Sequence, residues 1–141
     1  MLRIVIETVV FARRLINPYS RSGQIVFSHN KTYQLFVSEP IVKEILEVLK
    51  RPELTSKFHT LKKMDFNKIL KILSHAQAVE IPNVPNVSRD PKDNIFIATV
   101  IEAEVDFLVS EDKDLLDLKK YEGIKIINTE TFIEILNKLK Q

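Results

Sequence analysis

Short apolar runs alternate along the chain with segments in which apolar residues recur every three or four positions. The runs are typical of buried strands and the recurring spacing is typical of amphipathic helices. Strands are predicted over Leu2–Ile6, Tyr33–Val37, Ala78–Ile81, Asp106–Val109 and Ile124–Ile127. Helices are predicted over Val9–Leu15, Ser22–His29, Glu39–Lys50 (with Ser38 as N-cap), Leu54–Phe58, Met64–Ala76, Asp93–Ala103, Asp114–Leu118 and Thr129–Leu139.

Each predicted strand is followed by at least one predicted helix. Parallel strands need such crossover connections, and helices then cover both faces of the sheet. The pattern therefore predicts a three-layer α/β/α fold with a central parallel sheet of about five strands. With 141 residues, the chain has the size of one domain, predicted over residues 1–141.

Composition removes several classes of function. The net charge of +2 does not by itself indicate a nucleic-acid partner, and the absence of cysteine excludes disulfides and thiolate ligands. Two glycines, Gly23 and Gly123, cannot supply a glycine-rich phosphate-binding loop. No run approaches the roughly 18 apolar residues of a membrane-spanning helix. We therefore expect no membrane association and a cytoplasmic location.

Acidic residues recur at the ends of the predicted strands. In parallel sheets, ligands bind beyond the carboxyl ends of the strands. Glu7 follows the first strand, and Asp112 lies shortly after the strand that ends at Val109. Asp93 opens a buried helix, and Glu44 lies one turn inside the helix after the second strand. These four carboxylates are expected to face one cleft.

Clustered carboxylates repel one another unless they share protons or bind a cation. Oxygen ligands without His or Cys favour Mg²⁺ or Mn²⁺, and the matching chemistry is metal-assisted phosphodiester hydrolysis. Each residue also has a structural interpretation. Glu44 could be a solvated helical residue, Asp93 a helix-starting acid favoured by the helix dipole, and Glu7 half of a salt bridge. Asp112 could be a loop acid before a helix.

Four short motifs occur in one order along nearly the whole chain. They are Glu7-Thr8-Val9, the segment from Ser38 to Glu44, Asp90-Pro91-Lys92-Asp93-Asn94, and Ser110-Glu111-Asp112-Lys113-Asp114-Leu115-Leu116. In this order and spacing the chain resembles the PIN-domain family, and within it the subgroup of toxin components of toxin–antitoxin systems. Members of that family typically cleave single-stranded RNA with carboxylate-bound Mg²⁺ or Mn²⁺.

The resemblance implies a role for each matching residue. Glu7, Glu44, Asp93 and Asp112 would bind the metal and carry out catalysis. Ser110 would support the site by hydrogen bonding, and the further supporting candidates are Thr8, Asp90 and Asp114. The resemblance also implies an antitoxin partner and a homodimer.

Two positions depart from the family pattern, because Glu7 replaces the usual Asp and Val9 replaces a nearby Asn. The longer Glu side chain would displace the carboxylate by about 1.5 Å if nothing adjusted, and a misplacement of about 1 Å can cost on the order of a hundredfold in rate. Loss of a group that orients a metal ligand costs about 10- to 100-fold. The alternative function is therefore a degenerate PIN-fold protein that binds RNA or a partner without catalysis.

Basic residues offer possible contacts to RNA phosphates. Arg13, Arg14 and Arg21 lie near the expected cleft, and a second basic group lies between Lys50 and Ser74. The alternative is a solvated helical face. A phosphoacceptor of the response-regulator kind would need adjacent acids after the first strand and a lysine after the last strand. Thr8 follows Glu7 instead, and Asn128 follows the last strand.

Overall fold

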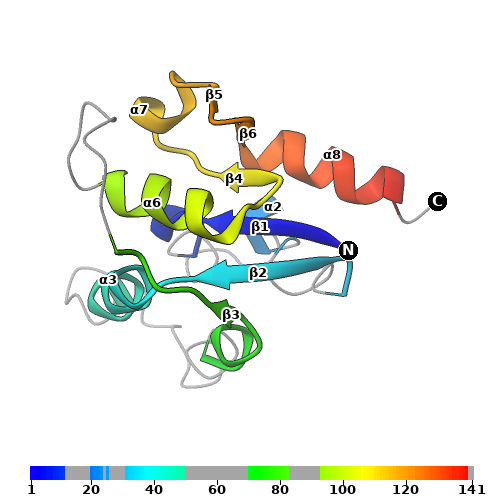
Figure 1. Cartoon of the computed structure of the whole chain (residues 1–141). Helices are drawn as coiled ribbons and strands as arrows, with labels where there is room; N and C mark the ends of the chain where they lie inside the picture. The colour runs from blue at the N-terminus through cyan, green and yellow to red at the C-terminus, as the bar shows by residue number, and fades with distance from the viewer. Residues whose placement is uncertain (12–19, 24, 26–30, 50–69, 83–92, 140–141) are drawn as a thin grey trace.

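A computed structural model gives the fold of this chain and describes residues 1–11, 20–23, 25, 31–49, 70–82 and 93–139 (Figure 1). Its centre is a six-stranded sheet with the order β3-β2-β1-β4-β6-β5. The strands are β1 (Leu2–Ile6), β2 (Tyr33–Val37), β3 (Gln77–Ala78), β4 (Phe107–Val109), β5 (Lys120–Tyr121) and β6 (Ile124–Ile127). All neighbours run parallel except β5 and β6.

Strand β1 occupies the middle of the sheet. Ile4 pairs with Leu35 of β2 on one side and with Phe107 of β4 on the other. Ile4, Val5 and Ile6 are at most 1% exposed, as expected for a strand covered on both faces. The end of β1 therefore lies between the ends of β2 and β4. This is the edge of the sheet at which the sequence leads us to expect the acidic residues.

Helices cover both faces of the sheet. They are α2 (Arg21–Gly23), α3 (Glu39–Leu49), α6 (Asn94–Ala103), α7 (Lys113–Leu116) and α8 (Thr129–Leu139). In Figure 1, α6 crosses the front of the sheet, where it packs on β1, β2 and β4. Helix α2 lies behind the sheet and contacts α8. The predicted three-layer α/β/α fold is confirmed. Within the described segments, no helix is long and apolar enough to cross a bilayer.

Helix α6 forms the centre of the front layer. Phe96, Ile97 and Val100 are at most 1% exposed, because its apolar residues surround the helix instead of forming one stripe. Its C-terminal end is tied to β1. Nη2 of Arg3 donates to the carbonyl of Ala103 at 2.6 Å, and the Arg3 guanidinium lies 4.3 Å from the centroid of the Phe36 ring.

Several predicted boundaries are wrong. The predicted strand Ala78–Ile81 is observed as Gln77–Ala78, although the N–H of Val79 still donates to the carbonyl of Val37 at 2.9 Å. The short helix is Lys113–Leu116 instead of Asp114–Leu118, because Asp112 caps it one residue earlier. Strand β5 was not predicted. The predicted helix Leu54–Phe58 lies outside the described residues, as do parts of the helices Val9–Leu15, Ser22–His29 and Met64–Ala76.

Candidate metal centre

The carboxyl ends of three neighbouring strands are joined by backbone hydrogen bonds. The N–H of Glu7, directly after β1, donates to the carbonyl of Val109 at 2.9 Å. The N–H of Ser110, directly after β4, donates to the carbonyl of Ile127 at 3.0 Å. The residues that follow these strands therefore lie at one edge of the sheet, which is where a parallel sheet places its ligands.

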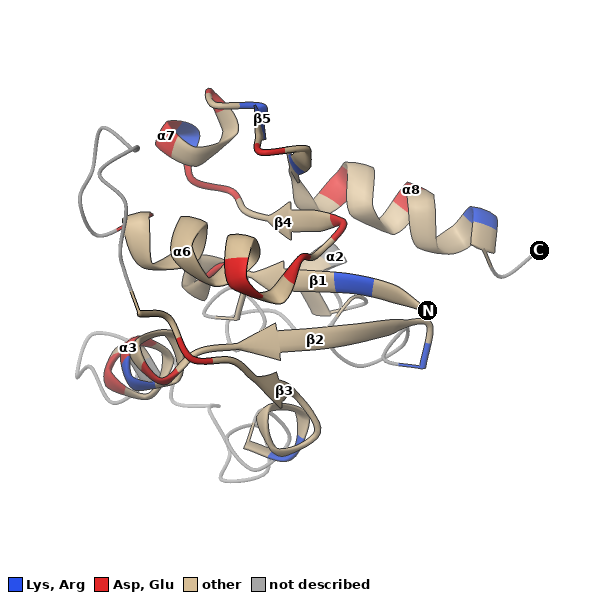
Figure 2. Ribbon diagram, in the orientation of Figure 1, with Lys and Arg blue, Asp and Glu red and all other residues tan. Residues whose placement is uncertain are grey.

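The turn between β4 and α7 is held by its own side chains. Oγ of the fully buried Ser110 accepts a hydrogen bond from the N–H of Asp112 at 2.9 Å. Oδ1 of Asp112 accepts from the N–H of Asp114 at 2.8 Å and so caps the start of α7. Figure 2 shows this acidic turn in red between β4 and α7. These two hydrogen bonds hold Asp112 and Asp114 in a defined arrangement within the turn.

Asp93 approaches the same turn from the front layer. It immediately precedes α6, is 4% exposed, and its side chain makes no capping bond to that helix. One carboxylate oxygen from each of Asp93, Asp112 and Asp114 lies within 4.8 Å of the others. Three carboxylates at this separation repel one another strongly when all are ionised.

Glu7 borders this cluster. Burial, and to a smaller extent the charges of Glu44, Asp112 and Asp93, raise the pKa of its carboxyl from the ordinary 4.5 to about 7. A hydrogen bond to Oε2 from the N–H of Val9, at 3.2 Å, partly opposes this shift in the pKa. Glu7 therefore lies within electrostatic range of the other three predicted acids, Glu44, Asp93 and Asp112.

The carboxylate of Glu44 is held by Thr8, the second residue after β1. Its half-buried carboxylate accepts a hydrogen bond through Oε2 from the hydroxyl of Thr8, at 3.0 Å. Thr8 itself is 4% exposed. The bond joins α3 to the residue that follows Glu7, and it holds the carboxylate of Glu44 toward the end of β1.

A divalent cation fits the donor set of this site. The three aspartates supply carboxylate oxygens at close range, and His and Cys ligands are absent from the clusters found in the described segments. Oxygen-only ligands favour Mg²⁺, Mn²⁺ or Ca²⁺ over zinc. A bound cation would also offset the repulsion among Asp93, Asp112, Asp114 and Glu7. The chemistry open to such a site is hydrolysis of a phosphate ester.

The site residues predicted from the sequence reach different positions. Asp93 and Asp112 are brought together, and Asp114, predicted only as a supporting residue, joins them. Glu7 lies within electrostatic range of Asp93, Asp112 and Glu44, and Glu44 is hydrogen-bonded to Thr8. Asp90, Arg13 and Arg14 lie outside the described residues, as does the side chain of Arg21.

Sequence reasoning gave no role to Glu111. Its Oε1 accepts a hydrogen bond from the N–H of Thr129, at the start of α8, at 3.1 Å. The sequence shows Glu111 only as one more acid in an acidic turn. Its different direction could be found only from the packing of α8 against the turn.

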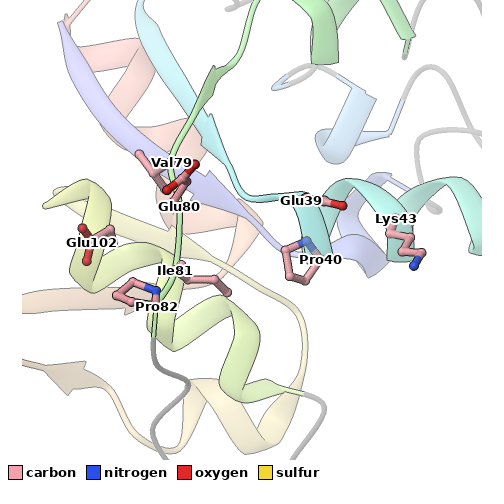
Figure 3. Close-up of a pocket in the computed structure, with 8 residues that line it drawn as sticks. All are labelled: Glu39, Pro40, Lys43, Val79, Glu80, Ile81, Pro82 and Glu102. Carbon is pink, nitrogen blue, oxygen red and sulfur yellow. The ribbon is translucent and has the colours of Figure 1, made fainter.

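A separate pocket of about 720 Å³ lies away from the acidic cluster (Figure 3). It is bounded by the start of α3, the segment after β3, and Glu102 of α6. None of the predicted site residues lines it. Its lining residues are Glu39, Pro40, Lys43, Val79, Glu80, Ile81, Pro82 and Glu102.

Comparisons with known proteins agree with this geometry. The family model described as PIN domain matches residues 3–114. The protein MJ1680 of Methanocaldococcus jannaschii is 33% identical over an alignment of 123 residues that covers 84% of this chain and 76% of that protein.

Two solved structures share the fold. PAE2754 from Pyrobaculum aerophilum has a TM-score of 0.57 at 15% identity, over 97% of this chain and 90% of that one. VapBC2 from Rickettsia felis, in a structure bound to a DNA fragment from the VapBC2 promoter, has a TM-score of 0.60 at 11% identity. The match covers 90% of this chain and 98% of that one. At these identities, the similarity concerns the fold alone.

Proposed function

The chain belongs to the PIN-domain family, and from this premise we propose that it is a metal-dependent endoribonuclease, the toxin of a toxin–antitoxin pair. Its substrate is single-stranded RNA. One observation carries the proposal: carboxylate oxygens of Asp93, Asp112 and Asp114 lie within 4.8 Å of one another, beside the buried Glu7. Such a cluster is the arrangement that metal-assisted cleavage of a phosphodiester needs.

In this proposal, Asp93, Asp112 and Asp114 hold Mg²⁺ or Mn²⁺, with Glu7 and Glu44 beside them. When bound, the cation supplies an activated water and offsets the charge that develops on the phosphate. The protein contributes the positions of its ligands. Ser110 and Asp112 fix the turn, while Thr8 holds the carboxylate of Glu44.

Glu7 has a second part in the proposal. With a pKa of about 7, its carboxyl exchanges a proton with solvent near neutral pH in the metal-free protein. A nearby divalent cation favours the charged form and lowers that pKa. Binding of metal is therefore expected to release a proton, and metal affinity is expected to rise between pH 6 and pH 8.

The biological role is proposed from the family motifs. The four acidic motifs resemble those of the toxin subgroup, and the fold shared with VapBC2 of Rickettsia felis is compatible with that role. We propose an antitoxin protein as partner, a homodimer as the assembly and the cytoplasm as the location. Arg13, Arg14 and Arg21 are the proposed contacts to RNA phosphates.

The test measures cleavage of labelled single-stranded RNA in EDTA, Mg²⁺ or Mn²⁺. The proposal expects cleavage that requires metal and is lost in Asp112→Asn. This variant keeps the side-chain oxygen that caps α7, so loss of activity would report loss of the charged ligand. Metal-independent cutting, or full activity of Asp112→Asn, would contradict the proposed chemistry.

A second function is favoured by Val9. Its side chain is 39% exposed beside Glu7, and it cannot form the hydrogen bonds of the Asn that the family has there. The corresponding function is binding of RNA or a partner protein without cleavage. If the native chain is inert but Glu7→Asp with Val9→Asn cuts RNA, the native chain has lost catalysis, as this second function requires. If both versions are inert, the assignment of the metal ligands is wrong.

A further inference from the structure

Glu111 lies between two residues of the acidic turn but turns its carboxylate to another element. Its neighbours Ser110 and Asp112 hydrogen-bond within the turn. Glu111 Oε1 instead accepts from the N–H of Thr129, 18 residues further along the chain. We infer that Glu111 is a positioning residue that holds Asp112 and Asp114 in place for the metal; this inference rests on the proposed function.

The hydrogen bonds of the turn indicate what Glu111 adds. Those of the Ser110 hydroxyl and the Asp112 carboxylate stay inside the turn and shape it locally. The N–H of Ser110 attaches the turn to the end of β6 at its first residue. The side chain of Glu111 links the turn to the start of α8 in the back layer. It therefore fixes the orientation of the turn relative to the sheet.

The partner of Glu111 suits a carboxylate. The 11-residue helix α8 begins at Thr129, and the free N–H groups of a helix start favour a negative acceptor. Thr129 is 3% exposed, so solvent has little access to its N–H. Without Glu111, this donor would lose its acceptor, and the turn would lose its attachment to α8.

The same helix start offers a matched control. Oδ1 of Asn128 accepts from the N–H of Thr131 at 2.8 Å, so Asn128→Ala also removes an acceptor from the first turn of α8. That bond stays within residues 128–131 and does not involve the acidic turn. A comparison of Glu111→Ala with Asn128→Ala therefore separates positioning of the turn from the general stability of α8.

The experiment measures Mn²⁺ binding to the full chain by calorimetry. Glu111→Ala is expected to weaken binding at least about 10-fold, in the range known for residues that orient metal ligands. Glu111→Gln keeps a side-chain oxygen as acceptor and is expected to bind close to wild type, as is Asn128→Ala. Equal binding by Glu111→Ala and wild type would overturn the inference. Equal weakening by Asn128→Ala, or no rescue by Gln, would also overturn it.

A second readout does not depend on the metal. Amide hydrogen exchange at Asp112 and Asp114 reports the two bonds that shape the turn. Exchange at these amides should be faster in Glu111→Ala than in Asn128→Ala. If wild type binds no Mn²⁺, or Asp112→Asn binds as well as wild type, the proposed function fails. Amide exchange then still decides whether Glu111 holds the turn.

Discussion

The hydroxyl of Thr8 donates a hydrogen bond to Oε2 of Glu44 at 3.0 Å, across 36 positions of sequence. It links the residue after Glu7 to α3, so two of the predicted acids are coupled through one buried side chain. Removal of either partner would therefore disturb the acidic edge of the sheet as well as the stability of the fold.

Thr8→Val is expected to lower the free energy of unfolding by about 1 to 3 kcal/mol, because the part-buried carboxylate of Glu44 loses a donor. Thr8→Ser keeps the hydroxyl and should recover most of that loss. Urea denaturation at pH 8 measures both values. Equal stability of the Val variant and wild type would show that water replaces the Thr8 hydroxyl at no cost.

Glu7 should make the metal-free protein less stable as pH rises. Its pKa is about 7 when folded against 4.5 ordinarily, so the folded state holds the extra proton between these values. The associated stability is full below pH 4.5 and is lost as pH rises through 7. At about 1.4 kcal/mol per unit, the loss is about 3 kcal/mol.

Glu7→Gln removes that titration. Relative to wild type, the variant should gain stability between pH 5 and pH 8 in EDTA. Urea midpoints at four pH values measure the difference between the two proteins, in which contributions from the other titrating groups largely cancel. A difference that stays constant with pH would show that the Glu7 carboxyl titrates near its ordinary pKa.

Mn²⁺ should stabilise the folded protein through the three aspartates. At a free concentration of 100 times Kd, ligand binding adds about 2.7 kcal/mol to the free energy of unfolding. Asp93→Asn should lose most of this increment. Glu102→Gln is the matched control, because Glu102 is an exposed acid on α6, the helix that Asp93 precedes, and lies outside the cluster. Thermal unfolding with and without Mn²⁺ measures the increment, and an unchanged increment in Asp93→Asn would remove Asp93 from the ligand set.

A buried hydroxyl pair joins Ser38, the residue before α3, to Thr99 of α6. Oγ of Ser38 and Oγ1 of Thr99 lie 2.8 Å apart, and Oγ1 of Thr99 also donates to the carbonyl of Ile95 at 2.7 Å. Both residues are at most 1% exposed. Thr99→Val should cost about 1 to 3 kcal/mol, because the Ser38 hydroxyl then lacks a partner.

A double-mutant cycle tests that pair. Ser38→Ala with Thr99→Val removes both hydroxyls, so the double variant should lose less stability than the two single losses combined. Denaturant titration of the four proteins gives the coupling energy. Additive losses would mean that the two hydroxyls do not stabilise each other.

The sequence predicted the fold where apolar runs mark buried strands. β1, β2 and β6 have the predicted boundaries, because each is an apolar segment that packs within the sheet. The edges were harder to predict. Val79 and Ile81 belong to an apolar run, yet β3 ends at Ala78, and β5 is a two-residue strand without an apolar run. The turn at Glu122 and Gly123, both with positive φ, makes β5 possible, and Glu is an unusual residue for that conformation.

The sequence predicted those parts of the candidate site that follow directly from where strands and helices begin and end. The alternating pattern placed Glu7 and Asp112 after strand ends and added Asp93 and Glu44 by their positions in the predicted helices, and the resemblance to PIN domains implied metal binding for all four. The closeness of Asp114 depends on the cap that Asp112 forms over α7. The diversion of Glu111 to α8 depends on tertiary packing. The second relationship is not encoded in residue type or spacing.

The central position of β1 has a consequence for biosynthesis. Residues 2–6 leave the ribosome well before one neighbour of this strand, which begins at residue 107, and the guanidinium of Arg3 binds the carbonyl of residue 103. Domains fold as units during synthesis, and distant pairings form late. A nascent chain therefore carries Glu7 long before Asp93, Asp112 and Asp114 can join it. The acidic site can be assembled only after residue 114 has been made.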